Sequence, residues 1–146
     1  MCPDAPARRQ PASAAPSWRA VPRAPSAYPS HPHALPDTVL ECGPYRMRFT
    51  RTPAELRLIQ GLRYDVFNEE LGAGLASAQA ARLDDDGFDG CCHHLLVETR
   101  DAGEVVGTYR LQTGAMALAQ RGFYAGSLFD ITAPAADLAH DAVEIG

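Results

Sequence analysis

The sequence of 146 residues contains no lysine, so all 13 of its basic residues are arginines. This absence indicates a compositional bias and carries no functional message by itself. The sequence also lacks any apolar run that approaches the roughly 18 residues needed to cross a bilayer. Its N-terminus lacks the apolar centre of a secretory signal. We therefore expect neither a transmembrane helix nor export.

Cys-x-x-Cys pairs are also missing, because the four cysteines stand at positions 2, 42, 91 and 92. In a protein inside the cell, such a set predicts free thiols. The formal net charge is −5, and basic residues form no stripe along the sequence. Both features argue against a nucleic acid as partner.

Proline is distributed unevenly, since nine of the twelve prolines lie in residues 1–40 among many alanines and serines. This segment shows no periodic apolar pattern and cannot bury enough surface to offset the entropy of ordering it. We predict that residues 1–40 form a disordered tail. Residues 41–146, with nine arginines against sixteen acidic residues, form the folding unit.

The folding unit begins with a predicted strand and helix. Residues 45–50 alternate apolar and polar side chains, as in a half-buried strand. Thr52 and Glu55 have the spacing of a capping box, and a proline occupies the first helical position between them. The helix is expected to continue to about Leu71, where Gly72 ends it.

A second group of elements follows an acidic loop at residues 84–90. Residues 93–98 and 104–112 have strand character on either side of a turn, which predicts a hairpin. A short helix near 115–120 and the opening of a strand at 142–145 complete the sequence. The predicted fold is therefore α+β, in the order β-α-β-β-(α)-β with an antiparallel sheet.

Four neighbouring residues, Cys91, Cys92, His93 and His94, are of the types that bind zinc. Adjacent residues at the start of a strand point to opposite faces of the sheet, so these four side chains cannot converge on one ion. Structural zinc sites also draw on two separated pairs of ligands. We expect no metal site here.

The acidic loop reads DDDGFDG, and within it Asp86 and Asp89 lie three apart around a glycine. Their carboxylates can turn to one side. The loop lacks the alternating ligands and the late glutamate of a calcium-binding loop. A site for a cation or an amine and a solvated surface loop are both compatible with this pattern.

Two arginines interrupt apolar patterns. Arg63 shares a helical stripe with apolar residues, and Arg110 lies in an apolar strand. Such arginines either extend outward to solvent or pair with buried carboxylates. With the acidic loop and a strand carboxylate at Glu144, they are compatible with an ion-pair network that lines a cleft.

Together these motifs resemble the acyl carrier protein-dependent branch of the GNAT-type acyltransferases. The motifs are Arg63-x-x-x-Phe67, Asp86-x-x-Asp89, His94-Leu95-Leu96-Val97, the strand from Glu104 to Leu111, and Glu144-Ile145-Gly146. Two related families share them, the L-ornithine N-alpha-acyltransferases and the acyl-homoserine lactone synthases. The ornithine family fits better, because the signal synthases usually carry a tryptophan after the helix, where this chain has Gly72-Ala73-Gly74.

The resemblance implies transfer of a 3-hydroxyacyl group from acyl carrier protein to the α-amine of L-ornithine, in the synthesis of lyso-ornithine lipid. It implies that Glu144 is the general base, a role that suits a carboxylate because the amine must lose a proton to react. No cofactor is expected beyond the acyl carrier protein thioester, and no metal.

The resemblance also implies a set of substrate-binding residues. Asp86 and Asp89 would meet the second amine of ornithine. Arg63 and Arg110 would hold these acids in place or meet the substrate carboxylate, where a bidentate guanidinium fits best. Phe67 would wall the acyl or amine pocket.

The resemblance covers residues 45–146, and the sequence stops where the family continues. We therefore expect residues 41–146 to be the N-terminal part of a GNAT-like acyltransferase domain, truncated and inactive by itself. A homoserine lactone synthase-like enzyme and a non-catalytic relic or interaction module are the alternatives. The expected location is the cytoplasm, with peripheral contact at the inner face of the membrane.

Overall fold

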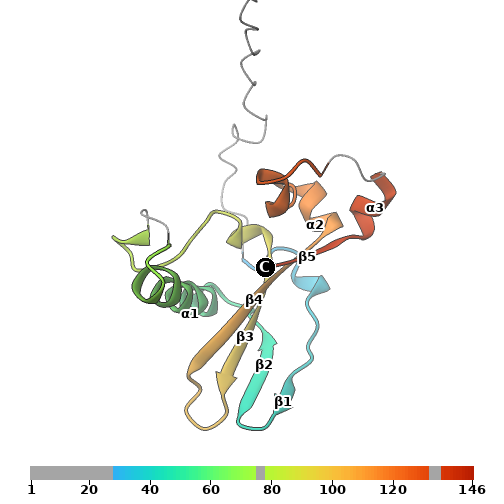
Figure 1. Cartoon of the computed structure of the whole chain (residues 1–146). Helices are drawn as coiled ribbons and strands as arrows, with labels where there is room; N and C mark the ends of the chain where they lie inside the picture. Colours follow the sequence, from blue (N-terminus) through green and yellow to red (C-terminus); the bar gives the residue numbers. More distant parts are fainter. Residues whose placement is uncertain (1–27, 75–77, 132–135) are drawn as a thin grey trace, which may run out of the picture.

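The computed structural model describes residues 28–74, 78–131 and 136–146. Residues 1–27, the greater part of the predicted tail, lie outside the described residues. Within the described part, the chain forms one antiparallel sheet with helices around it (Figure 1). No helix in this part of the chain combines the length and apolar character that crossing a bilayer requires.

Five strands lie in the sheet in chain order, and every neighbouring pair is antiparallel. They are β1 (Leu40–Cys42), β2 (Tyr45–Phe49), β3 (His93–Thr99), β4 (Val105–Thr113) and β5 (Val143–Ile145). The predicted α+β class and antiparallel sheet are confirmed. Strand β1 was not predicted, because its three exposed residues carry no alternating pattern.

Helix α1 (Pro53–Tyr64) begins where the capping box predicted. The Thr52 side chain accepts a hydrogen bond from the Glu55 N–H at 3.2 Å, and Glu55 Oε2 accepts one from the Thr52 N–H at 3.1 Å. The chain continues as a wider helical turn, η3 (Asp65–Glu70), and leaves the helix at Gly72, whose φ of +63° favours glycine. Both ends of the helix were thus predicted, and the widening of its last turns was not.

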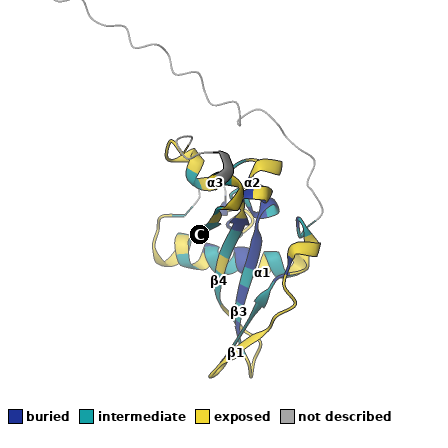
Figure 2. Ribbon diagram, turned by 90° about the vertical axis from the view of Figure 1, so that its right-hand side faces the viewer, coloured by how far each residue is buried: buried dark blue, intermediate teal, exposed yellow. Residues whose placement is uncertain are grey.

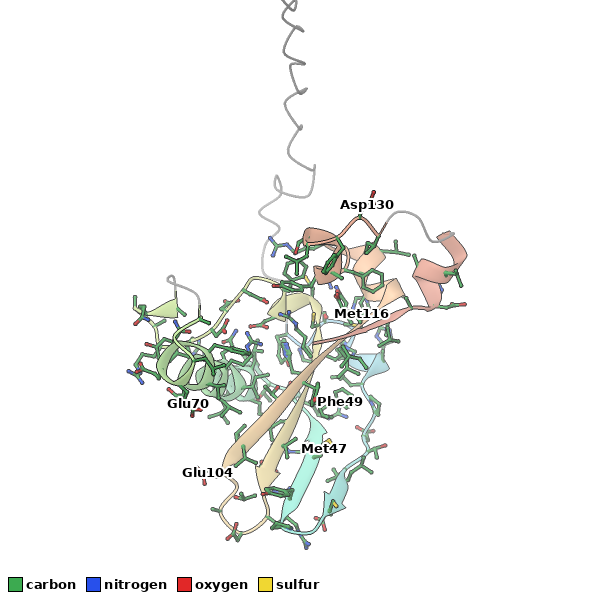
Figure 3. All side chains as sticks on the ribbon, viewed as in Figure 1. Met47, Phe49, Glu70, Glu104, Met116 and Asp130 are labelled. Atoms are coloured by element: carbon green, nitrogen blue, oxygen red, sulfur yellow. The ribbon has the colours of Figure 1, made fainter. Side chains whose placement is uncertain are left out.

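The core lies between α1 and the sheet. Ile59 and Tyr64 on α1 and Leu96 on β3 are 0–1% exposed, and Figure 2 shows buried residues gathered along β3. Glu70 and Glu104 lie at the periphery in Figure 3, and the tips of the hairpins are exposed as well. The buried end of the sheet is therefore the end at which β3 begins and β4 ends.

Short helical segments cover this buried end. They are η5 (Asp89–Cys91), α2 (Gly114–Ala119), η6 (Tyr124–Ser127) and α3 (Ala136–Asp141). Helix α3 approaches α2 so closely that a Cβ on Gly114 would lie 1.9 Å from the Ala139 carbonyl oxygen. Helix α2 had been predicted near residues 115–120, but α3 and η6 had not.

Residues 28–40 differ from the expectation of a disordered tail to residue 40. Ser30 and Leu35 are 5% and 7% exposed, and His93 Nε2 donates a hydrogen bond to the Ser30 carbonyl oxygen at 2.7 Å. The Tyr28 hydroxyl is hydrogen-bonded to the Thr50 side chain. A few side-chain contacts are enough to hold this segment against β2 and β3. The prediction of disorder rested on average composition, which contains no information about such single contacts.

Candidate functional site

The centre of the candidate site is the carboxylate of Asp89, which lies at the start of η5 and is 1% exposed. Arg63 donates to both of its oxygens, from Nη1 to Oδ1 at 2.8 Å and from Nη2 to Oδ2 at 2.7 Å. Gln60, one turn earlier on α1, donates from Nε2 to Oδ2 at 2.8 Å. The bidentate arginine pair is a strong, directional interaction. Helix α1 is thereby tied to the acidic loop.

Arg110 joins the same cluster from β4. Its Nη1 donates to Asp86 Oδ2 at 2.5 Å and lies 3.5 Å from Asp89 Oδ1. Its guanidinium lies over the ring of Tyr124, with 5.2 Å between the guanidinium carbon and the ring centroid. The Tyr124 ring in turn meets Phe88 edge to face. The loop, the sheet and η6 therefore converge on Arg110. We call this set, Gln60, Arg63, Asp86, Asp89 and Arg110, the arginine–aspartate network.

Charges in the network follow from burial and pairing. Burial alone would raise the pKa of Asp89, but the hydrogen bonds and charge of Arg63 outweigh it and hold that pKa below its ordinary value. Burial would lower the pKa of both arginines, yet Asp89 raises that of Arg63 and Asp86 raises that of Arg110. Asp84 differs, because burial raises its pKa despite the nearby Arg63. Asp89, Arg63 and Arg110 are therefore all charged at neutral pH.

His94 lies beneath the network on β3. Its side chain is fully buried, and Nε2 lies 3.4 Å from Asp89 Oδ1 without forming a hydrogen bond. Its ring stacks with that of Tyr28 at 6.0 Å between centroids. Burial, reinforced by the charges of Arg63 and Arg110, lowers the pKa of His94 to about 4. The imidazole is therefore neutral at neutral pH.

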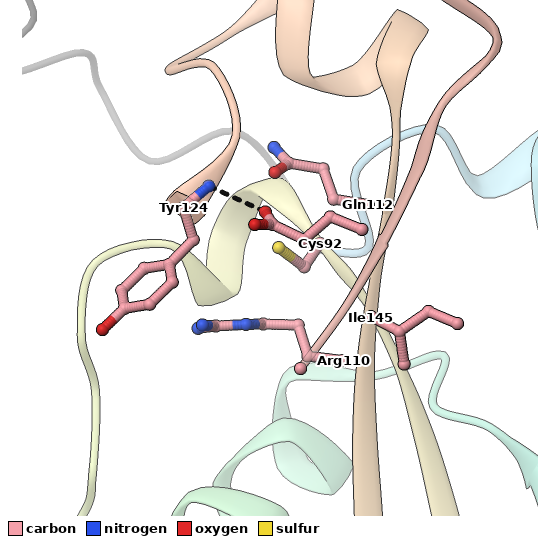
Figure 4. Close-up of a pocket in the computed structure, with 7 residues that line it drawn as sticks. Cys92, Arg110, Gln112, Tyr124 and Ile145 are labelled. Atoms are coloured by element: carbon pink, nitrogen blue, oxygen red, sulfur yellow. Dashed lines mark hydrogen bonds between the residues drawn. The ribbon is translucent and has the colours of Figure 1, made fainter. Parts of the chain in front are cut away.

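A small pocket of about 50 Å³ adjoins the network on the side of β5 (Figure 4). Its lining residues come from the end of η5, from β4, from η6 and from β5 with the residue after it, and they are Cys92, Arg110, Gln112, Tyr124, Glu144, Ile145 and Gly146. Both oxygens of the Glu144 carboxylate accept backbone hydrogen bonds at 2.7 Å, from the N–H groups of Tyr124 and Ala125. Glu144 stands opposite Gln112 in the β4–β5 register. The Cys92 thiol is buried, and burial raises its pKa to about 12.

The structure brings together five of the six site residues predicted from the sequence. Arg63, Asp86, Asp89 and Arg110 meet in the network, and Glu144 shares the pocket with Arg110. Phe67 lies apart on η3, is 43% exposed and does not line this pocket. The two arginines hold the acids, which was one of the two roles expected of them.

Two polar residues at the site, Gln60 and Gln112, were missed, and His94 was named only as a rejected zinc ligand and as part of a motif. All three are 0–6% exposed. Gln60 lies three residues before Arg63, and Gln112 two residues after Arg110 on the same strand face. Their spacing from the two arginines was the available signal. A neutral amide among apolar residues, unlike a charged side chain, does not by itself indicate a site.

Metal binding finds no support among the described residues, where no three histidine, cysteine, aspartate or glutamate side chains group in a way that could hold an ion. The adjacent cysteines and histidines at the start of β3 are buried, and His94 faces Asp89 across 3.4 Å while His93 bonds the Ser30 carbonyl.

Comparisons with known proteins place this geometry in a family. The chain is similar to three proteins named L-ornithine N(alpha)-acyltransferase. The protein from Agrobacterium fabrum is 42% identical over 61% of this chain and 32% of its own length. That from Rhizobium meliloti is 41% identical over 58% and 30%, and that from Brucella abortus 35% over 61% and 34%. The chain thus spans about a third of the length of the curated relatives it matches.

Solved structures show no significant similarity to the chain. Residues 62–146, more than half of the chain, match the family model described as acetyltransferase (GNAT) domain. This match contains Arg63, Asp86, Asp89, Arg110 and Glu144. The chain belongs to the GNAT acetyltransferase domain family.

Proposed function

We propose that the protein is an N-acyltransferase that transfers an acyl group to the α-amine of L-ornithine. One observation carries the proposal: Glu144 and Arg110, a carboxylate and a guanidinium, line one pocket, and Asp86 fixes the guanidinium there. A pocket with both charges suits an amino acid, which carries an amine and a carboxylate on one carbon. The names of the relatives support ornithine as that amino acid.

Glu144 acts in this proposal as the general base. The α-amine of an amino acid is mostly protonated at neutral pH and must lose a proton before it attacks a thioester. Both carboxylate oxygens of Glu144 already accept a backbone hydrogen bond, but each retains a further lone pair for the ammonium. The backbone N–H groups of η6 hold the carboxylate in position. From there it takes the proton of the amine, directly or through one water.

The arginine–aspartate network positions Arg110 for the substrate carboxylate. Asp86 engages Nη1 of Arg110, and a guanidinium has five N–H donors, so others remain for a ligand. Asp89 is saturated by Arg63 and Gln60 and is buried. Its part is therefore to anchor the network, while Asp86, with 21% of its side chain exposed, is the acid that can meet the second amine.

The acyl donor in the proposal is a 3-hydroxyacyl thioester of acyl carrier protein. The free amine attacks the thioester carbonyl, the C–N bond forms and the C–S bond breaks. Glu144 takes the proton that the ammonium loses before the attack. The second proton, lost from the nitrogen as the amide forms, goes to the thiolate of the carrier, which leaves as the free thiol. The balance requires no cofactor. Phe67, exposed on η3, is the residue expected to wall the acyl chain.

The test is thiol release by the full-length protein, supplied with 3-hydroxyacyl thioester of acyl carrier protein and one amine at a time. L-ornithine should release free carrier thiol and yield an amide detected by mass spectrometry. Release with S-adenosylmethionine alone would identify a homoserine lactone synthase-like enzyme. Release with neither amine would support the non-catalytic alternative.

We further propose that the protein works in the cytoplasm and makes peripheral contact with the inner face of the membrane. Its lipid product would enter the membrane at that face. Large apolar side chains at the end of the sheet support this contact, since Leu118, Leu128 and Phe129 are 63–68% exposed. Flotation with liposomes tests it, and full recovery of the protein in the unbound fraction would count against membrane contact.

A further inference from the structure

The side chain of Gln112 is the one polar group of the pocket that is buried without a partner among the described residues. It is 1% exposed, and neither Oε1 nor Nε2 has a hydrogen bond within the part of the chain that the structure describes. A buried amide without a partner is costly, because water satisfied both its donors and its acceptor before folding. Such a group at the wall of a pocket points to a ligand.

The neighbours of Gln112 in the pocket do have partners. Glu144 accepts the two backbone N–H groups of η6, and Arg110 donates to Asp86. Gln112 stands directly opposite Glu144 across the β4–β5 pair and two residues beyond Arg110 on the same face of β4. Figure 4 shows the labelled side chains of Arg110 and Gln112, from β4, and of Cys92, just before β3, extending to one side, that of Tyr124. The amide therefore lies in the same wall as the carboxylate and the guanidinium.

The chemistry of this wall specifies a ligand that both donates and accepts. An amide offers two N–H donors and a carbonyl acceptor, Glu144 offers acceptors only, and Arg110 offers donors only. An α-amino acid head group complements all three, because its amine donates and its carboxylate accepts.

We propose that Gln112 is a substrate-positioning residue, with Oε1 accepting a hydrogen bond from the α-amine and Nε2 donating one to the α-carboxylate. This inference rests on the proposed function and adds a contact to it. Gln112 orients the amine beside Glu144, so that the proton is taken from the α-amine and not from the side-chain amine of the substrate.

The test compares two methionine variants of the full-length protein by calorimetric titration with L-ornithine. Gln112→Met keeps the volume and removes the donor and the acceptor. Gln120→Met is the matched control, because Gln120 lies at the end of α2 outside the pocket. The expected result is an affinity at least about tenfold weaker for Gln112→Met, as for a lost hydrogen bond to a charged group, and unchanged for Gln120→Met.

Putrescine, which lacks the carboxylate, sharpens the test. Gln112→Met should weaken L-ornithine binding more than putrescine binding, and an equal loss for both ligands would overturn the contact from Nε2. Equal affinity of wild type and Gln112→Met for L-ornithine would overturn the inference and leave the proposed function standing. No binding of L-ornithine to the wild type would overturn the proposed function itself.

Thermal unfolding without ligand distinguishes positioning from a structural role. The melting temperature of Gln112→Met should equal or exceed that of the wild type, because no internal hydrogen bond is lost. A melting temperature lowered by several degrees would show that the amide has a partner inside the protein, and would overturn the inference.

Discussion

The two sides of Arg110 differ in the pairing of their buried glutamine amides, although neither ring nitrogen of His94, beneath the network, has a hydrogen bond within the described residues. On one side, Asp89 is buried with both oxygens bonded to Arg63 and Gln60. On the other side, the pocket contains the buried amide of Gln112, which has no hydrogen-bond partner among the residues that the structure describes. A saturated cluster holds a structure in place, whereas an unsaturated one has capacity left for a ligand. This difference supports the proposal that the network serves stability and the pocket serves binding and chemistry.

The largest effect is expected from Asp89→Asn, which removes the charge at the centre of the network. Arg63 and Arg110 would then be half-buried cations with one carboxylate fewer to balance them. Breaking a buried pair by removing one partner typically costs about 3–5 kcal/mol. Urea unfolding of the purified protein measures this loss.

The matched control is Asp65→Asn, at the start of η3 on the surface. Asp65 pairs with Arg82 at 3.4 Å, and both side chains are more than 60% exposed. Exposed pairs contribute roughly 0–1 kcal/mol. Equal losses in the two variants would contradict the structural role assigned to the network.

The second prediction concerns the loss of folding stability at acidic pH. His94 has a pKa of about 4 in the folded protein against 6.5 ordinarily. Between these values the unfolded chain binds a proton that the folded chain does not, so stability falls as pH falls from 6.5 to 4. The difference reaches at most about 3 kcal/mol. It is measured as the free energy of unfolding at several pH values.

His94→Leu isolates this contribution, because leucine is apolar and His94 makes no hydrogen bond within the described part of the chain. The variant should lose less stability than the wild type between pH 6.5 and 4. Asp89 affects the pH dependence of stability only at lower pH. Its pKa lies below the ordinary 3.8, and the stabilisation that its charge provides is lost as pH falls through that lowered value. Identical slopes for wild type and variant would contradict the buried neutral imidazole.

On the pocket side, Glu144→Gln should lower turnover by about 10²-fold, the usual scale for a lost general base. The unfolding free energy should change by only about 1 kcal/mol, as for one altered hydrogen bond. Glu104→Gln, at an exposed position before β4, is the control for both measurements. Unchanged turnover would remove Glu144 from the role of base, and a large loss of stability would move it to the structural side of the comparison.

The same contrast explains what could be predicted from the sequence. Charged residues that interrupt apolar patterns, such as Arg63 and Arg110, are visible because burial of a charge demands a partner. The capping box at Thr52 and the hairpin at β3 and β4 are local, and local patterns are enough to place them. The pattern was compatible with an ion-pair network between the loop aspartates and these arginines, but it did not show which residues meet, because the contacts are 21–26 residues apart.

Gln112 and residues 28–40 could not be predicted for a related reason. An amide is buried or exposed according to the tertiary packing around it, and its lack of a partner is visible only once every neighbour is placed. Residues 28–40 are held by single anchors such as Leu35 and Ser30, which a reading of average composition passes over. Sequence patterns are detected because they repeat along the chain. The buried amide of Gln112 and the anchors of residues 28–40 each occur only once.

The smallest effect, and the one that tests where the two sides meet, is expected from Arg110→Lys. Lysine keeps the charge but loses the planar fork that bonds Asp86 while lying over Tyr124. We expect a loss of about 1 kcal/mol in unfolding free energy together with a raised KM for the amine substrate. Arg82→Lys is the matched control, because Arg82 also lies over a tyrosine ring, at 4.9 Å from that of Tyr64, and pairs with carboxylates, but at the surface. A raised KM in Arg110→Lys alone would show that Arg110 serves the pocket as well as the network. A loss of stability with an unchanged KM would confine it to the network and leave Gln112 and Glu144 as the polar groups that bind substrate.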